Sequence, residues 1–218
     1  MHKLVIDLEM ADRYTKEYQG KIKFIHEIIQ VGAVLLDDDN TEINRYETLV
    51  KPQYSTIRKK ITDLTGITND MVKDAPHIDG AIQGLLDILV DADNTIICTW
   101  SDSDTKAILK EMELKGLHND IISKLCETYY DIQTEFDNKV GFDKQVSLTN
   151  ALELVGIDFE GRAHGALADA INTAKLYKEI NENDNIKEIL HNISDTMKAE
   201  PLTASLGSLF DFSQLSLN

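Results

Sequence analysis

The chain has 218 residues, of which 42% are hydrophobic, and this is enough to form one well-buried domain with an appendage. Its formal net charge of −16 at pH 7 disfavours a long electrostatic contact with nucleic acid, so any such contact should be short, locally basic and aided by metal ions. No apolar run reaches the roughly 18 residues of a membrane span and the N-terminus lacks a signal-peptide pattern, so we expect no membrane partner.

The first part of the chain predicts three strands joined as an antiparallel meander. Residues 3–9 contain Leu4, Val5 and Ile6, a branched apolar run typical of a buried strand. Residues 28–36 and 44–50 predict two further strands, with a short turn between them. The polar and mixed segment 10–26 predicts a loop or excursion.

After these strands, the spacing of apolar residues predicts helices that alternate with strands. Thr68 and Ser147 stand where helix N-caps are expected, and further strands are expected at 95–100 and 127–132. This order describes an α/β domain with a mixed sheet, which we place at residues 1–181, followed by a C-terminal helix and tail at 182–218. The expected helices of the domain cover residues 68–71, 78–89, 107–114 and 147–154. A further helix is expected at Cys126, and residues 162–180 contain the last long helix.

Acidic side chains gather at strand and helix ends. Because residues alternate between the faces of a strand, Asp7 and Glu9 share a face, where like charges raise each other's pKa unless a cation or solvent relieves them. Asp104 follows the fourth predicted strand, and Asp169 lies early in the last long helix. In open α/β sheets such ends meet at one edge. Four carboxylates without cysteine favour Mg²⁺ or Mn²⁺ over zinc, and solvated strand-end acids are the alternative.

The spacing of these residues resembles the three motifs of the DEDDh family of 3′–5′ exonucleases. The motifs are Asp7-x-Glu9, Asp104 within WSDSD, and His164 followed five residues later by Asp169. The similarity is closest to the histone-mRNA-exonuclease-like and sporulation-inhibitor-like branch. It implies a ribonuclease-H-like mixed sheet of about five strands flanked by helices. Further stretches resemble the family in the same order: EIIQVGAV (27–34), LVKP (49–52), DLTGIT (63–68) and EGRAHGALADAINTAKLY (160–177).

The resemblance also assigns roles to the acidic residues. It implies that Asp7, Glu9 and Asp169 hold a first divalent ion. Asp7 would also reach a second ion, and Asp104 would support the cluster directly or through water. Two such ions about 3.5–4 Å apart suit phosphodiester hydrolysis.

His164 would deprotonate the attacking water, a role that suits an imidazole near pH 7. Five helical steps would place it about 140° from Asp169, so we expect His164 in the loop before the helix. Gly161 and Gly165 would allow that loop to turn.

The substrate contacts follow from the same resemblance. Met10 would offer its backbone to the terminal sugar, with side-chain packing as the alternative. The segment Leu64, Thr65 and Gly66 would lie against the 3′-terminal nucleotide, although alone it reads as a turn. Ser103 stands where many relatives carry an aromatic residue, and base stacking on such a residue is worth about 1–3 kcal/mol.

These observations predict a metal-dependent 3′–5′ exonuclease with two Mg²⁺ or Mn²⁺ ions. It would act on 3′ ends of single-stranded RNA or DNA and release nucleoside 5′-monophosphates. A non-catalytic nucleic-acid or protein binding module on the same fold is the alternative, in line with the acidic charge and Ser103. A phosphatase with Asp7 as nucleophile fits poorly, because Glu9 stands where those enzymes carry aspartate.

Two features bear on setting and partners. The two cysteines, Cys98 and Cys126, fall in a predicted strand and a predicted helix, which favours reduced thiols and a cytoplasmic location. The segment Gln214–Leu217 resembles the start of a sliding-clamp-binding peptide, but the chain ends before the expected aromatic residue. A clamp contact through the tail is therefore one alternative, beside ordinary packing or disorder.

Overall fold

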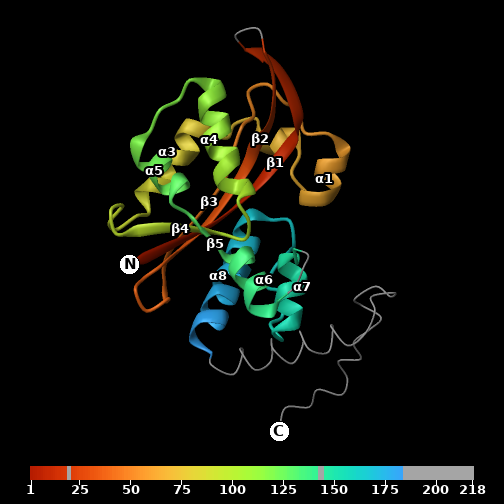
Figure 1. Ribbon diagram of the computed structural model, residues 1–218. Coiled ribbons are helices and arrows are strands. Elements are labelled where there is room, and N and C mark those ends of the chain that lie inside the picture. The colour runs from red at the N-terminus through yellow and green to blue at the C-terminus, as the bar shows by residue number, and fades with distance from the viewer. Residues whose placement is uncertain (19–20, 142–144, 184–218) are drawn as a thin grey trace.

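The computed structural model describes residues 1–18, 21–141 and 145–183, and these form one sheet with helices on both faces (Figure 1). The strand order is β3-β2-β1-β4-β5. Pairing is antiparallel between β1 and β2 and between β2 and β3, and parallel between β1 and β4 and between β4 and β5. The predicted mixed sheet with its leading meander is confirmed. The strands are β1 (His2–Tyr18), β2 (Lys21–Leu36), β3 (Glu42–Leu49), β4 (Thr95–Thr99) and β5 (Tyr130–Asp131).

The loop predicted at residues 10–26 is wrong. Strands β1 and β2 continue to pair as far as Tyr18 and Lys21, and they form a two-stranded arm that extends past the rest of the sheet (Figure 1). The ladder shifts register between Glu9 and Arg13, so the arm leaves the sheet through an irregularity. Strand prediction relies on the alternation of apolar and polar residues that a buried face produces. A two-stranded ribbon outside the core has no such face, so its sequence lacks this signal.

Eight helices lie in the described residues. The expected caps at Thr68 and Ser147 are confirmed, because their hydroxyl oxygens accept hydrogen bonds from the backbone N–H groups of Met71 and Asn150, each at 3.3 Å. Helices α1 and α6 are not predicted by the sequence pattern, and the fifth strand is only two residues long. The helices are α1 (Lys59–Thr65), α2 (Asn69–Val72), α3 (Ile78–Asp87), α4 (Ser103–Lys115), α5 (Asp120–Glu127), α6 (Ile132–Val140), α7 (Leu148–Leu154) and α8 (Ala166–Glu182).

The alternation of β1 divides the core into two layers. Leu4, Ile6 and Leu8 are buried with apolar residues of α3, α4 and α5. Val5 belongs to the layer formed with α6, α7 and α8. Because Asp7 shares the parity of Val5, it belongs to the face that α8 covers. The same alternation that buries the core therefore turns the acidic motif toward α8.

Three smaller expectations concern the core and the tail. Cys98 and Cys126 are buried and unbridged, and the partly buried Trp100 packs against Phe136 with ring centroids 5.9 Å apart. Within the described residues, no helix combines the length and the apolar character that crossing a bilayer requires. The helix expected at 184–198 and the clamp-like segment near the C-terminus lie outside the described residues. The boundary after residue 181 stays a prediction.

A buried ion triad ties β2, α4 and the segment before α1 together. The Nζ atom of Lys115 lies 2.8 Å from Glu27 and 2.7 Å from Glu111, and both carboxylates are fully buried. Glu27 also accepts backbone hydrogen bonds from Gln53 and Tyr54, while Glu111 accepts one from the backbone of Ile28. Hydrogen bonds to Lys115 and to these backbone groups lower the pKa of Glu27 against the opposing effect of burial. One lysine is thus the shared ion-pair partner of two carboxylates in the interior.

Replacing the lysine of this triad should destabilise the fold. In Lys115→Met, Glu27 and Glu111 stay buried without their cation, which costs about 3–5 kcal/mol in comparable buried pairs. Urea unfolding of the purified variant measures this loss. Lys124→Met is the control, because Lys124 pairs with Asp93 in solvent and its removal should change stability little. Equal, small effects in both variants would show that the triad is not structurally important.

Candidate active site

Asp104 is placed by the point at which β1 and β4 separate. The two strands pair only as far as Val5 and Cys98, and after Thr99 the chain turns into α4. The backbone N–H of Leu8, beyond this ladder, donates to Oδ1 of Asp104 at 3.1 Å. The side chain of Asp104 is buried in the first turn of α4. The end of the parallel pairing therefore brings Asp104 beside the strand that carries Asp7.

The start of α8 is pressed against β2 directly beside the acidic strand. Gly32 is the register partner of Asp7, and a Cβ atom at Gly32 would lie 2.1 Å from backbone atoms of Ala166 and Leu167. Gln30, the partner of Glu9, accepts a hydrogen bond at Oε1 from the backbone N–H of Ala166 at 3.2 Å. Glycine allows the close approach, and Gln30 serves as a cap that the helix does not supply itself.

His164 lies in the loop before α8, as the helical spacing predicts. The helix begins at Ala166, and His164 has a left-handed backbone with φ of 63°. Gly161 is also left-handed, with φ of 86°. Gly165 has an extended backbone instead, so the turn predicted there is made by His164 itself. A left-handed histidine is uncommon and strained, and the loop holds it by a hydrogen bond from the His164 N–H to Asp169 Oδ2 at 3.2 Å.

The motif residues converge at this edge of the sheet. Side-chain ligand atoms of Glu9, His164 and Asp169 all lie within 4.8 Å of one another. Asp7 is electrostatically linked to the same group, because Asp104, Asp169 and Glu9 all raise its pKa in addition to burial. Residues from the two ends of the domain and from its middle therefore form one cluster.

Burial raises the pKa of each acid in this cluster, and repulsion by the other cluster acids adds to it at Asp7 and Glu9. Burial, then Asp169 and Asp104, raises the pKa of Glu9 to about 7. Burial raises the pKa of Asp104 to about 7, although the hydrogen bond from Leu8 opposes it. The pKa of Asp169 is raised by burial and partly lowered by the hydrogen bond and charge of His164. Within the described residues, no lysine or arginine forms an ion pair with these acids.

This donor set fits a hard divalent cation. The oxygen ligands come from carboxylates that lack an internal counter-charge, and one imidazole lies among them. Such ligands suit Mg²⁺ or Mn²⁺, because an added cation would relieve the repulsion that raises the pKa of Asp7 and Glu9. The chemistry of the cluster therefore matches the metal that the motifs imply.

The residues predicted to contact substrate differ in how far they are exposed to solvent. Met10 is half-buried at the register shift of β1 and packs against the core. Leu64 is 44% exposed, whereas Thr65 is buried and its hydroxyl donates to the Ile61 carbonyl at 2.9 Å. Gly66 ends α1 with φ of 81°. What this segment can offer to a ligand is therefore the exposed Leu64 side chain.

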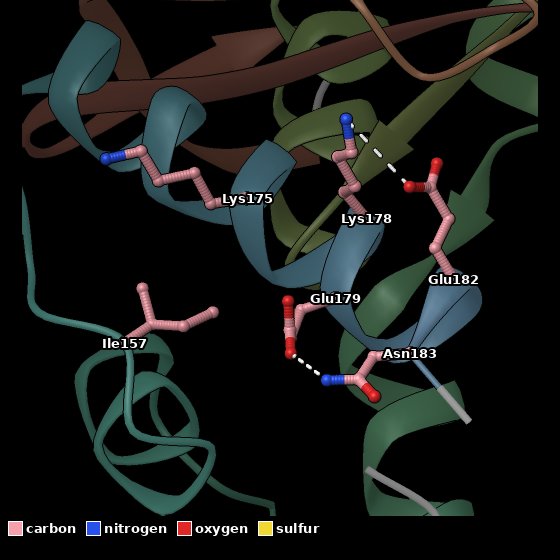
Figure 2. Close-up of a pocket in the computed structure, with 6 residues that line it drawn as sticks. All are labelled: Ile157, Lys175, Lys178, Glu179, Glu182 and Asn183. Atoms are coloured by element: carbon pink, nitrogen blue, oxygen red, sulfur yellow. Dashed lines mark hydrogen bonds and ion pairs between the residues drawn. The ribbon is translucent and has the colours of Figure 1, made fainter. Parts of the chain in front are cut away.

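The hollow at the other end of α8 is separate from this cluster. It has a volume of about 520 Å³, and Figure 2 shows Lys178 directed to Glu182 and Glu179 to Asn183. Glu182 lies 13 residues after Asp169 on the same helix, which is about 20 Å along the axis. The charged groups here interact with one another. This hollow is lined by Ile157, Lys175, Lys178, Glu179, Glu182 and Asn183.

The fold and the acid cluster define the class of nucleases built on a ribonuclease-H-like sheet. A family model described as "Exonuclease" matches residues 4–177. The chain belongs to this exonuclease family, and the resemblance to its DEDDh type is confirmed.

Three named relatives show the extent of the similarity. A protein of Bacillus subtilis, "Probable 3'-5' exonuclease KapD", is 26% identical over 97% of this chain and 95% of its own length. The zebrafish "ERI1 exoribonuclease 2" is 30% identical over 79% of this chain and 34% of its own. Human "3'-5' exoribonuclease 1" is 26% identical over 79% of this chain and 50% of its own length. The chain thus spans about a third and a half of the latter two relatives.

Solved structures share the fold. The nuclease domain of 3′hExo, a DEDDh family member bound to rAMP, has a TM-score of 0.70 at 24% identity and covers 84% of this chain and 92% of its own. Pop2p of S. pombe in its Mg²⁺- and Mn²⁺-bound form has a TM-score of 0.58 at 18% identity. The match covers 85% of this chain and 84% of the Pop2p chain. The ions named for that neighbour are of the kind that the donor set described above would suit.

The metal-free protein should lose stability as the pH rises. Since the pKa values of Glu9 and Asp104 are raised to about 7 by folding, their contribution to stability is full below about pH 4 and is lost as the pH rises through about 7. Thermal unfolding in EDTA across this range measures the effect. The midpoint of Glu9→Gln should fall less steeply than that of the wild type, and Mg²⁺ or Mn²⁺ should flatten the wild-type curve. Parallel curves under all conditions would contradict the proposed repulsion.

Adding a methyl group at Gly32 should disturb the acid cluster through α8. The clash is with backbone, so Gly32→Ala must shift the helix, at a cost of about 1–3 kcal/mol or more. The thermal stabilisation by Mn²⁺ should shrink, because Asp169 moves with α8. Gly116→Ala is the control: it strains a left-handed residue by about 1–2 kcal/mol in open space. Gly116→Ala should keep the full thermal stabilisation by Mn²⁺. If Gly32→Ala is stabilised by Mn²⁺ to the same extent, the contact between Gly32 and α8 is not important for the acid cluster.

Proposed function

We propose that this protein is a metal-dependent 3′–5′ exonuclease that shortens single-stranded RNA or DNA and releases nucleoside 5′-monophosphates. One observation carries the proposal: Glu9, His164 and Asp169 meet within 4.8 Å, and Asp7 and Asp104 share their electrostatic field. Each residue occupies the position that the DEDDh motifs give it. A fold retained only for binding would not need this set intact.

RNA is the substrate that the named relatives favour. The zebrafish and human relatives are called exoribonucleases, and one structure with the same fold is titled as recognising a histone mRNA stem-loop by its 3′ end. Another neighbour, exonuclease I, was solved with a dT13 oligonucleotide, so the fold also accommodates DNA. The comparisons do not support a sliding-clamp partner. The free, buried thiols of Cys98 and Cys126 favour a reducing setting such as the cytoplasm.

Two Mg²⁺ or Mn²⁺ ions would be held by Asp7, Glu9, Asp104 and Asp169. When bound, they would neutralise the acids and stabilise the charge that develops on the phosphate. The scaffold contribution is clear from the contacts described above: Leu8 fixes Asp104, and the N-terminal loop of α8 fixes Asp169. The acids are therefore positioned before any ligand arrives.

His164 would act as the general base. Its imidazole lies at the exposed edge of the cluster, where it can accept the proton of the attacking water and pass it to solvent. The water oxygen forms the new bond to phosphorus, and the bond from phosphorus to the 3′ oxygen of the preceding nucleotide breaks. That oxygen leaves as the new 3′ hydroxyl once it is protonated. The strained loop holds the imidazole close to the acids without placing it on α8.

Degradation of labelled oligonucleotides tests the proposal. With Mg²⁺ or Mn²⁺, a 5′-labelled single-stranded RNA should shorten stepwise, and a 3′-labelled one should release its label as a mononucleotide. Asp7→Asn should abolish both products. His164→Asn should slow them by about 10²–10⁴-fold, which is the usual contribution of a general base.

Binding without hydrolysis would instead support the non-catalytic module. Ser103, whose hydroxyl contacts Ser101 at 2.6 Å, offers no ring on which a base could stack. Matched RNA and DNA substrates, single- and double-stranded, would show which polymer the site prefers. Activity that is equal in the wild type and Asp7→Asn would refute the assigned site.

A further inference from the structure

Arg162 links the two segments that flank the acid cluster. It lies in the loop that carries His164, and its Nη2 donates to the carbonyl oxygen of Leu64 at 3.4 Å. A Cβ atom at Gly66 would lie 2.1 Å from Arg162 Nη1, so the guanidinium rests directly on the backbone where α1 ends. The two segments are nearly a hundred residues apart in sequence. The guanidinium therefore spans the rim of the site between the His164 loop and the Leu64–Gly66 turn.

The loop that carries Arg162 is held rigidly. The buried side chain of Asn172 accepts from the backbone N–H of Glu160 at 2.9 Å and donates to its carbonyl at 2.8 Å. Asn172 also donates to the Ala168 carbonyl at 2.8 Å, so α8 itself fastens the start of the loop. The backbone on either side of Arg162 is thus fixed at Glu160 and at His164. A fixed backbone lowers the entropic cost of holding a ligand with a long side chain.

The charge of Arg162 is not used inside the described part of the chain. No described carboxylate lies within 4.0 Å of it, in contrast to Arg45, which pairs with Glu42 at 2.6 Å. Arg162 is exposed, and the contact to Leu64 engages one of its five N–H donors. In a chain of net charge −16, an exposed guanidinium beside an acid cluster is an uncommon local positive charge.

We propose that Arg162 binds a phosphate of the substrate strand next to the scissile bond. This inference rests on the proposed exonuclease function and names a group for substrate binding that the DEDDh motifs do not include. The planar fork of arginine matches two phosphate oxygens at once. The Leu64 carbonyl engages Nη2 alone, and Arg162 is exposed, so N–H donors remain for a phosphate. The phosphate contact would hold the strand while its 3′ end lies on the acids.

Equilibrium binding tests this proposal apart from catalysis. All proteins carry Asp7→Asn so that no hydrolysis occurs, and a 5′-fluorescent single-stranded RNA is titrated by anisotropy in Mg²⁺ across salt concentrations. Arg162→Gln should weaken binding roughly tenfold, as expected for a lost charged hydrogen bond. It should also lower the slope of log affinity against log salt by about 0.7, the value of one phosphate contact in a single strand.

Two further variants separate charge from structure. Lys124→Gln removes one positive charge at the pair with Asp93, before the start of β4, and should leave affinity and slope unchanged. Arg162→Lys keeps the charge but not the fork, so it should keep the salt slope and lose part of the affinity.

Neutral methylphosphonates placed one at a time along the RNA identify the phosphate. At the position that Arg162 contacts, the substitution should weaken the parent protein but not Arg162→Gln. If every position weakens both proteins equally, or if Arg162→Gln binds like the parent, the proposal for Arg162 is wrong while the exonuclease function stands. If the parent itself binds no oligonucleotide, the proposed function fails together with it.

Discussion

The repulsion among carboxylates at one edge of the sheet is the constraint on which the rest of the structure depends. Asp7, Glu9, Asp104 and Asp169 are each shifted toward the neutral form by burial, and repulsion from the other cluster acids adds to this at Asp7 and Glu9. An arrangement of this kind persists only if the surrounding fold enforces it. Here α8 is pressed onto Gly32 and the N–H of Leu8 holds Asp104. The packing of the start of α4 against β1 and of α8 against β2 therefore maintains an unfavourable charge density that a divalent cation would relieve.

The interior triad shows the opposite solution to the same problem. Glu27 and Glu111 are more deeply buried than the cluster acids, but Lys115 lies between them and backbone N–H groups donate to Glu27. The chain thus supplies its own cation where acids serve to join β2, α4 and the segment before α1. At the sheet edge the described residues supply none. The presence or absence of an internal counter-charge separates a structural acid cluster from one that is open to a metal.

Local sequence features predict the site residues better than they predict the residues that hold α8 beside them. Period-two alternation places Asp7 and Glu9 on one face, and helical spacing places His164 in the loop, because both depend only on neighbouring residues. The roles of Gly32 and Gln30 depend on α8, more than 130 residues away, and a short apolar strand gives no sign of them. The arm of β1 and β2 escapes prediction for a related reason, since a ribbon outside the core has no apolar alternation.

The acidic net charge follows naturally from a site of this kind. A chain of net charge −16 repels a polyanion on average, so attraction is expected where the acids gain cations and where Arg162 is exposed. Attraction limited to one edge favours a strand end over a strand interior, because an interior segment would have to pass repulsive surface on both sides. Under the proposed function, this charge distribution would favour short contacts with a strand terminus.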